Sequence, residues 1–125
     1  MVFDINKIKR KTDEINFVLD GDEYTSERLT MEDEAVYASL YYSKDGKTYI
    51  PVYAKLLRLC KIYKCPYTRE SIEQVIGIKN KTWDCLTISE RFNFFNGLES
   101  DYITKLLKAY ELNSGNEKIQ EELKN

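Results

Sequence analysis

An alternating stretch near the start of the chain predicts the only sheet structure that the sequence signals clearly: Ile15-Asn-Phe-Val-Leu-Asp-Gly-Asp-Glu-Tyr24. Its apolar residues occupy every second position, as on a strand with one buried face: Ile15, Phe17 and Leu19. Asp20 and Gly21 both tolerate positive φ, and this pair is a strong signal for a two-residue hairpin turn. The sequence therefore predicts a β-hairpin, with a return strand over residues 23–28.

Beyond the hairpin, helical periodicity replaces this alternation, and about five helices are expected. Thr30 caps the first helix, with Asp33 three residues further on as the partner of an imperfect capping box. The helices are expected over Met31–Tyr42, over Val52–Tyr63, from Thr68 to Gly77, from the capping box at Thr87–Glu90 to Gly97, and over Tyr102–Leu112. The predicted fold class is α+β and mostly α: an N-terminal β-hairpin followed by a bundle of about five helices.

The apolar positions of these elements predict one hydrophobic core. Its expected members are Phe17, Met31, Leu40, Leu56, Leu59, Ile72, Trp83, Phe92, Phe95, Ile103 and Leu106. No repeat and no Pro/Gly/Ser linker divides the chain, so we expect a single globular domain over residues 1–112. Residues 113–125 are expected to form a polar, mobile C-terminal tail.

The composition is that of a globular intracellular protein. The chain has 125 residues, of which 42% are hydrophobic, and it contains ten tyrosines and five phenylalanines. These values are too apolar for a disordered chain. The start of the chain has no apolar stretch typical of a signal peptide, and no run is long enough to span a bilayer. We expect a cytoplasmic protein with reduced thiols at Cys60, Cys65 and Cys85, located in the host cytoplasm if it is viral.

The complete absence of histidine argues against an enzyme. Histidine is the commonest general base and the commonest metal ligand, and Ser-His and Cys-His nucleophile pairs require it. Three cysteines without an imidazole fall short of the four ligands of a structural zinc site. No glycine-rich phosphate loop is present either. We therefore expect no catalytic residue, no cofactor and no metal.

The middle of the chain supports nucleic-acid binding as an alternative. Residues 44–81 contain nine bases against three acids, although the net charge of the whole chain is −2. Residues 71–86 resemble a helix-turn-helix with its turn at Gly77-Ile78. In that interpretation four polar residues would approach phosphates and base edges: Lys79, Asn80, Lys81 and Thr82. The other interpretation of this segment is a structural corner, because short αα corners with glycine are common.

Aromatic residues favour a protein partner over nucleic acid. Tyr37 and Tyr41 form an i, i+4 pair away from the main apolar stripe of their helix, and Phe94 is rotated away from the stripe of its own. Such side chains pack inside by default. If they are exposed, they are suitable anchors for another protein, because aromatic residues dominate interface hot spots. The sequence therefore predicts Tyr37, Tyr41 and Phe94 as protein-binding residues.

Two segments resemble small assembly proteins of tailed bacteriophages. The first runs from the hairpin Ile15–Tyr24 to Leu29-Thr-Met-Glu-Asp-Glu34 and is similar to the N-terminal hairpin and the first helix of tail or baseplate-hub assembly chaperones. The second comprises Trp83-Asp-Cys-Leu86, Glu90-Arg-Phe-Asn-Phe-Phe95 and Leu98-Glu-Ser-Asp-Tyr-Ile103, which is similar to the C-terminal helices of such proteins. The resemblance implies a non-enzymatic protein that binds viral tail or baseplate subunits.

Overall fold

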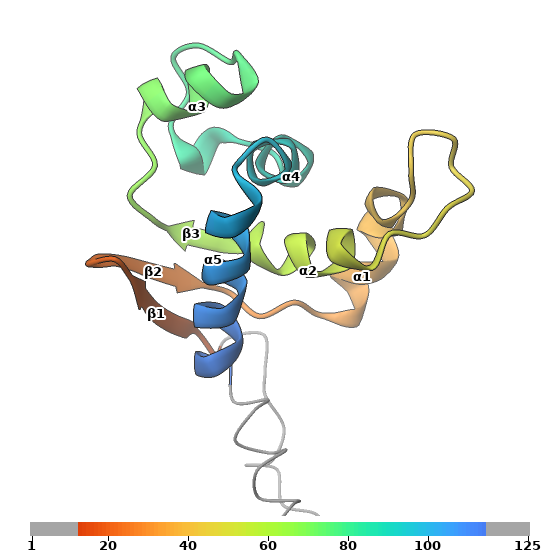
Figure 1. The fold of residues 1–125 in the computed structure, drawn as a ribbon, viewed down its shortest axis with the longest axis horizontal. Helices are drawn as coiled ribbons and strands as arrows, with labels where there is room; N and C mark the ends of the chain where they lie inside the picture. Colours follow the sequence, from red (N-terminus) through yellow and green to blue (C-terminus); the bar gives the residue numbers. More distant parts are fainter. Residues whose placement is uncertain (1–12, 115–125) are drawn as a thin grey trace, which may run out of the picture.

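The computed structural model describes residues 13–114. The basic start at Lys7, Lys9, Arg10 and Lys11 lies outside the described residues. The elements follow one another as β1 (Ile15–Leu19), β2 (Asp22–Ser26), α1 (Met31–Tyr37), the 3-10 helix η2 (Ala38–Tyr41), α2 (Pro51–Leu59), β3 (Ile62–Lys64), α3 (Arg69–Ile76), the 3-10 helix η3 (Trp83–Cys85), α4 (Ile88–Asn96) and α5 (Ser100–Asn113). This arrangement confirms the predicted fold class, α+β and mostly α (Figure 1).

The predicted hairpin is confirmed and belongs to a three-stranded antiparallel sheet of order β1-β2-β3. Phe17 lies opposite Tyr24, and the two rings stack with their centroids 5.0 Å apart. The turn residues Asp20 and Gly21 adopt φ values of 52° and 84°. A two-residue hairpin turn with both residues at positive φ matches the twist of the strands that it connects. The return strand is shorter than the expected 23–28 and ends at Ser26.

The third strand is a correction to the sequence analysis, which extended the second helix to Tyr63. Helix α2 ends at Leu59, and Ile62–Lys64 pairs with β2 instead. The reason is tertiary, because Ile62 is fully buried and its carbonyl accepts hydrogen bonds from Trp83 Nε1 at 2.7 Å and Arg91 Nη1 at 3.2 Å. These donors lie more than twenty residues away in sequence, so a local helical pattern cannot reveal them.

The predicted helix caps are confirmed. Thr30 and Thr87 each accept a hydrogen bond from the backbone three residues on, and the side chains of Asp33 and Glu90 bond back to complete capping boxes. Helix α3 ends at Gly77 in the left-handed conformation, with φ of 73°. A glycine is favoured there because it has no Cβ to clash. The first helix is shorter than predicted, because residues 38–41 tighten into the 3-10 helix η2.

The core lies between the inner face of the sheet and helices α2 to α5. Its aromatic centre is a group of rings in mutual edge and tilted contact: Tyr67, Trp83, Phe94 and Phe95. Helix α5 crosses the sheet (Figure 1), and the Tyr102 hydroxyl links those of Tyr24 and Tyr67 at 2.9 and 2.7 Å. Most of the predicted core residues are buried there. Leu40 is only partly buried. The prediction that Met31 belongs to the core was wrong, because its side chain is 80% exposed.

Helix α5 continues one residue beyond the Leu112 at which the sequence pattern ends. Asn113 is the last residue of α5, and Ser114 is buried, with its carbonyl accepting a hydrogen bond from Arg28 Nη1 at 3.0 Å. Residues 113 and 114 thus belong to the folded domain. The rest of the predicted tail, residues 115–125, lies outside the described residues.

Candidate functional site

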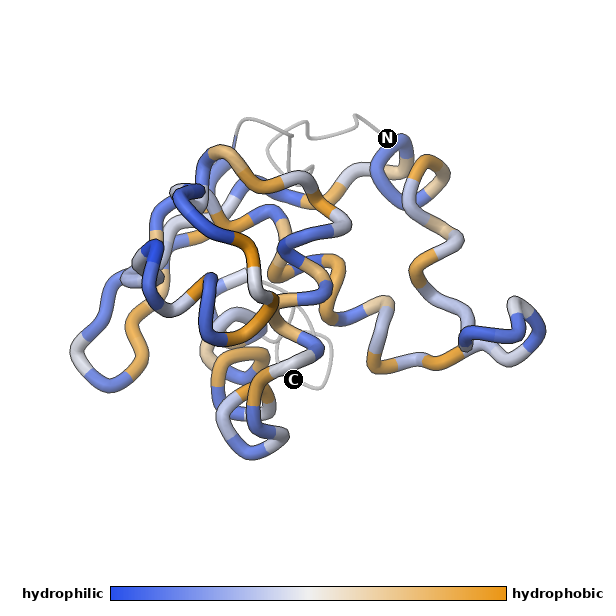
Figure 2. Tube along the Cα trace, turned by 90° about the horizontal axis from the view of Figure 1, so that it is seen from above, coloured by the Kyte–Doolittle hydropathy of each residue, from blue (hydrophilic) through white to orange (hydrophobic). Residues whose placement is uncertain are grey.

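Exposed apolar side chains concentrate in one part of the described chain. We call residues 31–52 the projecting segment; it comprises α1, η2, a loop and the first two residues of α2. Of the eight large hydrophobic side chains exposed among the described residues, five lie in it: Met31, Val36, Tyr42, Tyr49 and Val52. The segment extends to one side of the molecule, and hydrophobic stretches flank its hydrophilic tip (Figures 1 and 2). Such concentration on a small domain is typical of an interaction surface.

The loop of this segment, residues 41–50, is well ordered by its own backbone. We call it the tyrosine loop. Tyr42 and Tyr49 face each other across an isolated antiparallel bridge. Ser43 N donates to Thr48 O, and Ile50 N donates to Tyr41 O, both at 2.7 Å. The ring of Tyr49 contacts those of Tyr41 and Tyr42 edge-on, each with a centroid distance of 6.1 Å. The loop therefore presents two half-exposed rings on a frame that already has its shape.

Asp45 holds the tip of the tyrosine loop. Its Oδ1 accepts hydrogen bonds from the Ser43 hydroxyl and from the backbone N–H of Lys47 at 2.9 Å and of Thr48 at 3.4 Å. The hydrogen bond from Ser43, followed by those from the backbone, lowers the pKa of Asp45 below its ordinary value. Gly46 completes the turn with φ of 71°. The carboxylate thus replaces part of the hydrogen bonding that a longer pair of strands would supply.

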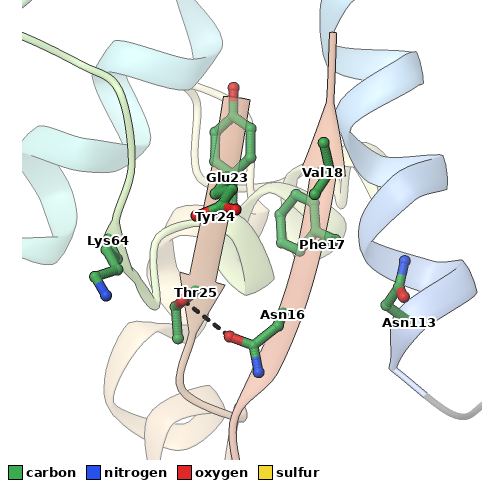
Figure 3. Close-up of a pocket in the computed structure, with 8 residues that line it drawn as sticks. All are labelled: Asn16, Phe17, Val18, Glu23, Tyr24, Thr25, Lys64 and Asn113. Atoms are coloured by element: carbon green, nitrogen blue, oxygen red, sulfur yellow. Dashed lines mark hydrogen bonds between the residues drawn. The ribbon is translucent and has the colours of Figure 1, made fainter. Parts of the chain in front are cut away.

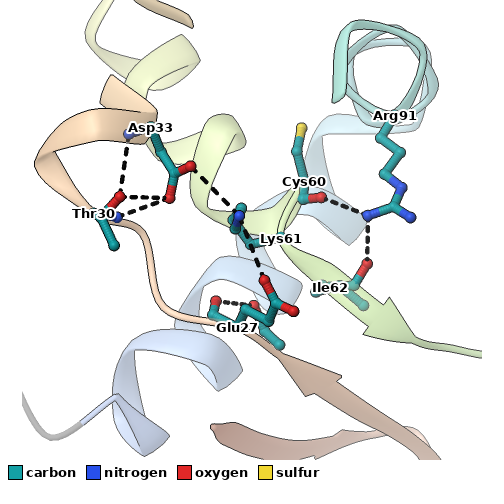
Figure 4. Close-up of polar contacts among 8 residues, drawn as sticks. Glu27, Thr30, Asp33, Cys60, Lys61, Ile62 and Arg91 are labelled. Carbon is teal, nitrogen blue, oxygen red and sulfur yellow. Dashed lines mark hydrogen bonds and ion pairs between the residues drawn. The ribbon is translucent and has the colours of Figure 1, made fainter. Parts of the chain in front are cut away.

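Helix α1 is attached to the domain through its polar side. Lys61 Nζ lies 3.5 Å from both Asp33 Oδ1 and Glu27 Oε2, and the side chains of Lys61 and Asp33 are only 13% and 14% exposed (Figure 4). Burial acts to raise the pKa of Asp33, but the hydrogen bonds from Thr30 and the charge of Lys61 outweigh it, so the pKa lies below the ordinary value. Two apolar side chains of α1 remain exposed to solvent, Met31 and Val36.

The three predicted protein-binding residues differ in their exposure to solvent. Tyr37 and Tyr41 belong to the projecting segment but are only partly exposed. Burial and the nearby Glu34 carboxylate raise the pKa of Tyr41, in keeping with its inward orientation. The prediction for Phe94 was wrong, because its side chain is 1% exposed. The rings of Tyr67 and Trp83 cover Phe94, and Tyr53 of α2 covers Phe92, so both faces of α4 are occupied.

The residues proposed for DNA recognition do not form a recognition helix. After Gly77 the chain runs as a loop through Lys79–Thr82, with Asn80 at φ of 62°, and then makes only the short 3-10 helix η3. Lys81 Nζ pairs with Glu90 at 3.4 Å, and the Thr82 hydroxyl donates to Cys85 Sγ. Residues 71–86 are therefore a structural corner, and the helix-turn-helix interpretation is corrected.

The structure offers no obvious chemistry elsewhere in residues 13–114. A hollow of about 560 Å³ lies over the sheet, with Glu23, Lys64 and Asn113 around it, but it holds no nucleophile beside a base (Figure 3). Burial raises the pKa of Cys60 to about 12 and that of Cys65 to about 11, so neither thiol is activated. Within the described range, no cluster of three or more His, Cys, Asp or Glu side chains could hold a metal ion.

The sequence carries only partial signals for the exposure of Tyr42 and Tyr49. Tyr42 is the last residue of the predicted helix Met31–Tyr42, and Tyr49 follows that helix in a segment without periodicity. The turn signal between them, Lys44-Asp-Gly-Lys47, indicated a loop, but a turn does not show whether its flanking rings are covered.

Comparison with known proteins adds no information about this surface. No protein family, no curated protein and no solved structure matches the chain. Among the described residues, no helix combines the length and the apolar character needed to cross a membrane.

Proposed function

We propose that this protein acts by binding another polypeptide stoichiometrically, without catalysis, through the projecting segment. The observation that carries the proposal is that five of the eight exposed large apolar side chains of the described residues lie in this one segment, Met31, Val36, Tyr42 and Tyr49 among them. Burying apolar surface stabilises a protein by about 25 cal/mol for each Å² removed from water. A partner that covered these exposed side chains would gain part of that free energy.

The tyrosine loop is the part of this surface best suited to recognition. Tyrosine brings a large, stiff and amphipathic side chain to an interface, because it has only two χ angles to order on binding. The backbone bridge and the Asp45 hydrogen bonds order the loop before any partner arrives. Preorganisation of this kind lowers the entropic cost of association. Exposed Glu32 on α1 and Lys44 and Lys47 in the loop would then set the orientation of the partner.

The resemblance of the hairpin and the α1 start to phage tail assembly chaperones makes tail and baseplate subunits the first partners to test. Tagged protein is co-produced with these subunits from its source, and the complex is separated by size-exclusion chromatography. We expect co-elution by the natural sequence and its loss in Tyr42→Ser/Tyr49→Ser, on the order of tenfold in affinity for each ring. The matched control is Tyr63→Ser, which removes a comparably exposed ring from β3.

Two results would contradict the proposal. One is that the natural protein neither co-elutes with nor solubilises any of these subunits. The other is that the double variant at positions 42 and 49 retains its full affinity while folding normally by circular dichroism. DNA binding is tested on the same samples: salt-sensitive retention on duplex DNA that Lys79→Glu/Lys81→Glu abolishes would support nucleic acid in place of a protein partner.

A further inference from the structure

Two carboxylates of α1 are better covered than its methionine and valine side chains. Asp33 and Glu34 are partly buried. Met31 and Val36 are 80% and 64% exposed, and α1 contains no buried residue. A surface helix of a small domain normally packs its apolar stripe against the core. The hydrophobic effect therefore contributes little to holding α1 in place, and polar contacts carry most of its attachment.

The chain is anchored to the domain on either side of α1. Before the helix, Glu27 N donates to Lys61 O at 3.1 Å. Arg28 Nη1 donates to Ser114 O at 3.0 Å. After the helix, η2 packs against α2. The span between these anchors is residues 29–37, which we call the strap; it contains α1 and thus the first part of the projecting segment.

Lys61 supplies the ionic contact between the strap and the domain. Its Nζ lies 3.5 Å from Asp33 Oδ1, in the strap, and 3.5 Å from Glu27 Oε2, in the domain (Figure 4). The side chains of Lys61 and Asp33 are only 13% and 14% exposed, so salt screens this pair less than a surface pair. One ammonium group is thus shared between a carboxylate of the strap and a carboxylate of the domain.

Both sides of this contact keep a partner when they separate. Asp33 Oδ2 accepts hydrogen bonds from the backbone N–H and the hydroxyl of Thr30, both at 3.0 Å and both within the strap. Lys61 keeps Glu27, because the backbone hydrogen bond between these two residues lies outside the strap. Leaving a buried charge without any partner is strongly unfavourable. Separation of the strap avoids that situation on either side.

We propose that the strap opens and closes on the folded domain. Lys61 pairs with both Asp33 and Glu27 in the closed state, and with Glu27 alone in the open state. Segments with few buried apolar contacts open at a lower free energy than the whole domain. The opening decides whether the α1 part of the projecting segment is held against the domain. It is a property of the free protein, goes beyond the proposed function, and can be tested without a partner.

The decisive variant is Glu27→Gln. In the closed state Glu27 and Asp33 approach the same ammonium group and repel each other, and opening removes this repulsion. Glu27→Gln should therefore favour the closed state and slow amide hydrogen exchange at Val36 and Tyr37 roughly threefold. Asp33→Asn should speed exchange at the same two amides by a similar factor. If both carboxylates only stabilised the fold, both substitutions would speed exchange.

Exchange detected by NMR measures these rates, with the amides of α5 as the reference for global unfolding. The matched control is Glu23→Gln, an exposed acid of β2 that does not pair with Lys61, and it should leave the two rates unchanged. Lys61→Met removes the charge and keeps an apolar stem of similar length. In that background Asp33→Asn should no longer speed exchange at Val36 and Tyr37.

Three results would overturn the proposal. The first is unchanged or faster exchange at Val36 and Tyr37 in Glu27→Gln. The second is an effect of Asp33→Asn that persists in Lys61→Met. The third is exchange at these amides that rises with urea as steeply as in α5, because α1 would then open only with the whole domain. Should Asp33→Asn fail to fold, Glu27→Gln decides alone, since the Glu27 side chain is 50% exposed.

Discussion

Individual side chains in this protein fall into two groups, those that stabilise the fold and those that are exposed to solvent. Arg91 is a clear case of the first kind. Its Nη1 donates to the carbonyls of Cys60 and Ile62 at 3.1 and 3.2 Å (Figure 4). Its Nη2 donates to the carbonyl of Trp83 at 3.2 Å. Its guanidinium also lies 5.2 Å from the Trp83 ring centroid. One cation thereby joins the end of α2, β3 and η3 to α4.

Phe94 and Val36 allow the two kinds of residue to be compared directly. Phe94→Ala should destabilise the fold by about 3–5 kcal/mol, because it leaves a cavity among the rings of Tyr67, Trp83 and Phe95. Val36→Ala should change the free energy of unfolding by less than about 0.5 kcal/mol, because its side chain is 64% exposed. Chemical denaturation measures both. A cost at Val36 equal to that at Phe94 would show that α1 belongs to the core.

The three thiols should react in an order set by burial. Cys85 is exposed, whereas burial raises the pKa of Cys65 to about 11 and that of Cys60 to about 12. Because the thiolate is the reactive form, iodoacetamide at pH 8 should modify Cys85 first and Cys60 only on unfolding. Mass spectrometry of the intact protein measures the number of groups added, and Cys85→Ser should remove the fast phase. Rapid labelling of Cys60 in the folded protein would contradict its buried position at the C-cap of α2.

At the scale of elements, the attachment of α1 to Lys61, which lies between α2 and β3, predicts a pH dependence. The pKa of Asp33 is lowered in the folded protein, so the stabilisation from its carboxylate is fully present above the unfolded value of about 3.9 and is lost as the pH falls through the folded pKa. Asp33→Asn should destabilise the protein at pH 7 by on the order of 1 kcal/mol. It should also flatten the decline of stability below pH 4.

The control for Asp33 is its neighbour in the first turn of α1. Glu32 is exposed, and Glu32→Gln should leave the acid limb of the stability curve unchanged. Urea denaturation from pH 3 to 7 distinguishes the variants. An unchanged curve for Asp33→Asn would mean that the contact with Lys61 contributes nothing to the attachment of the helix.

The whole molecule combines a firmly packed body with a lightly attached projecting segment. Helix α1 and η2 contain no buried residue, whereas α2, α4 and α5 each contain three or more. Segments with few buried apolar contacts open at a lower free energy than the global unfolding free energy. We expect amide hydrogen exchange in α1 to be faster than in α4 and α5, and to show a weaker dependence on denaturant.

Exchange should also respond to a partner. If the projecting segment is the binding surface, the partner should slow exchange in residues 31–52 without a comparable change at the β1–β2 turn. Mass spectrometry of proteolytic fragments measures both regions in one experiment. Protection confined to the hairpin would place the interface on the opposite side of the molecule.

Much of this architecture follows from sequence alone because its signals are local. Asp20-Gly21, the capping boxes at Thr30 and Thr87, and Gly77 act through contacts within a few residues, and all of them form as predicted. The α+β class and the helix order follow from these signals together with periodicity. The absence of histidine likewise excludes Ser-His and Cys-His nucleophile pairs within the given chain.

Tertiary structure alone decided which apolar residues are covered. Periodicity places Phe94 on a lateral face of its helix and Met31 on a main stripe, yet Phe94 is buried against the rings of Tyr67 and Trp83 and Met31 faces water. Strand β3 exists because Trp83 and Arg91 hydrogen-bond to Ile62 from distant positions, and residues 79–82 stay a loop instead of becoming a second helix. Whether a residue is buried depends on which elements pack against its face. Those elements are distant in sequence, so the local pattern of residues carries no information about them.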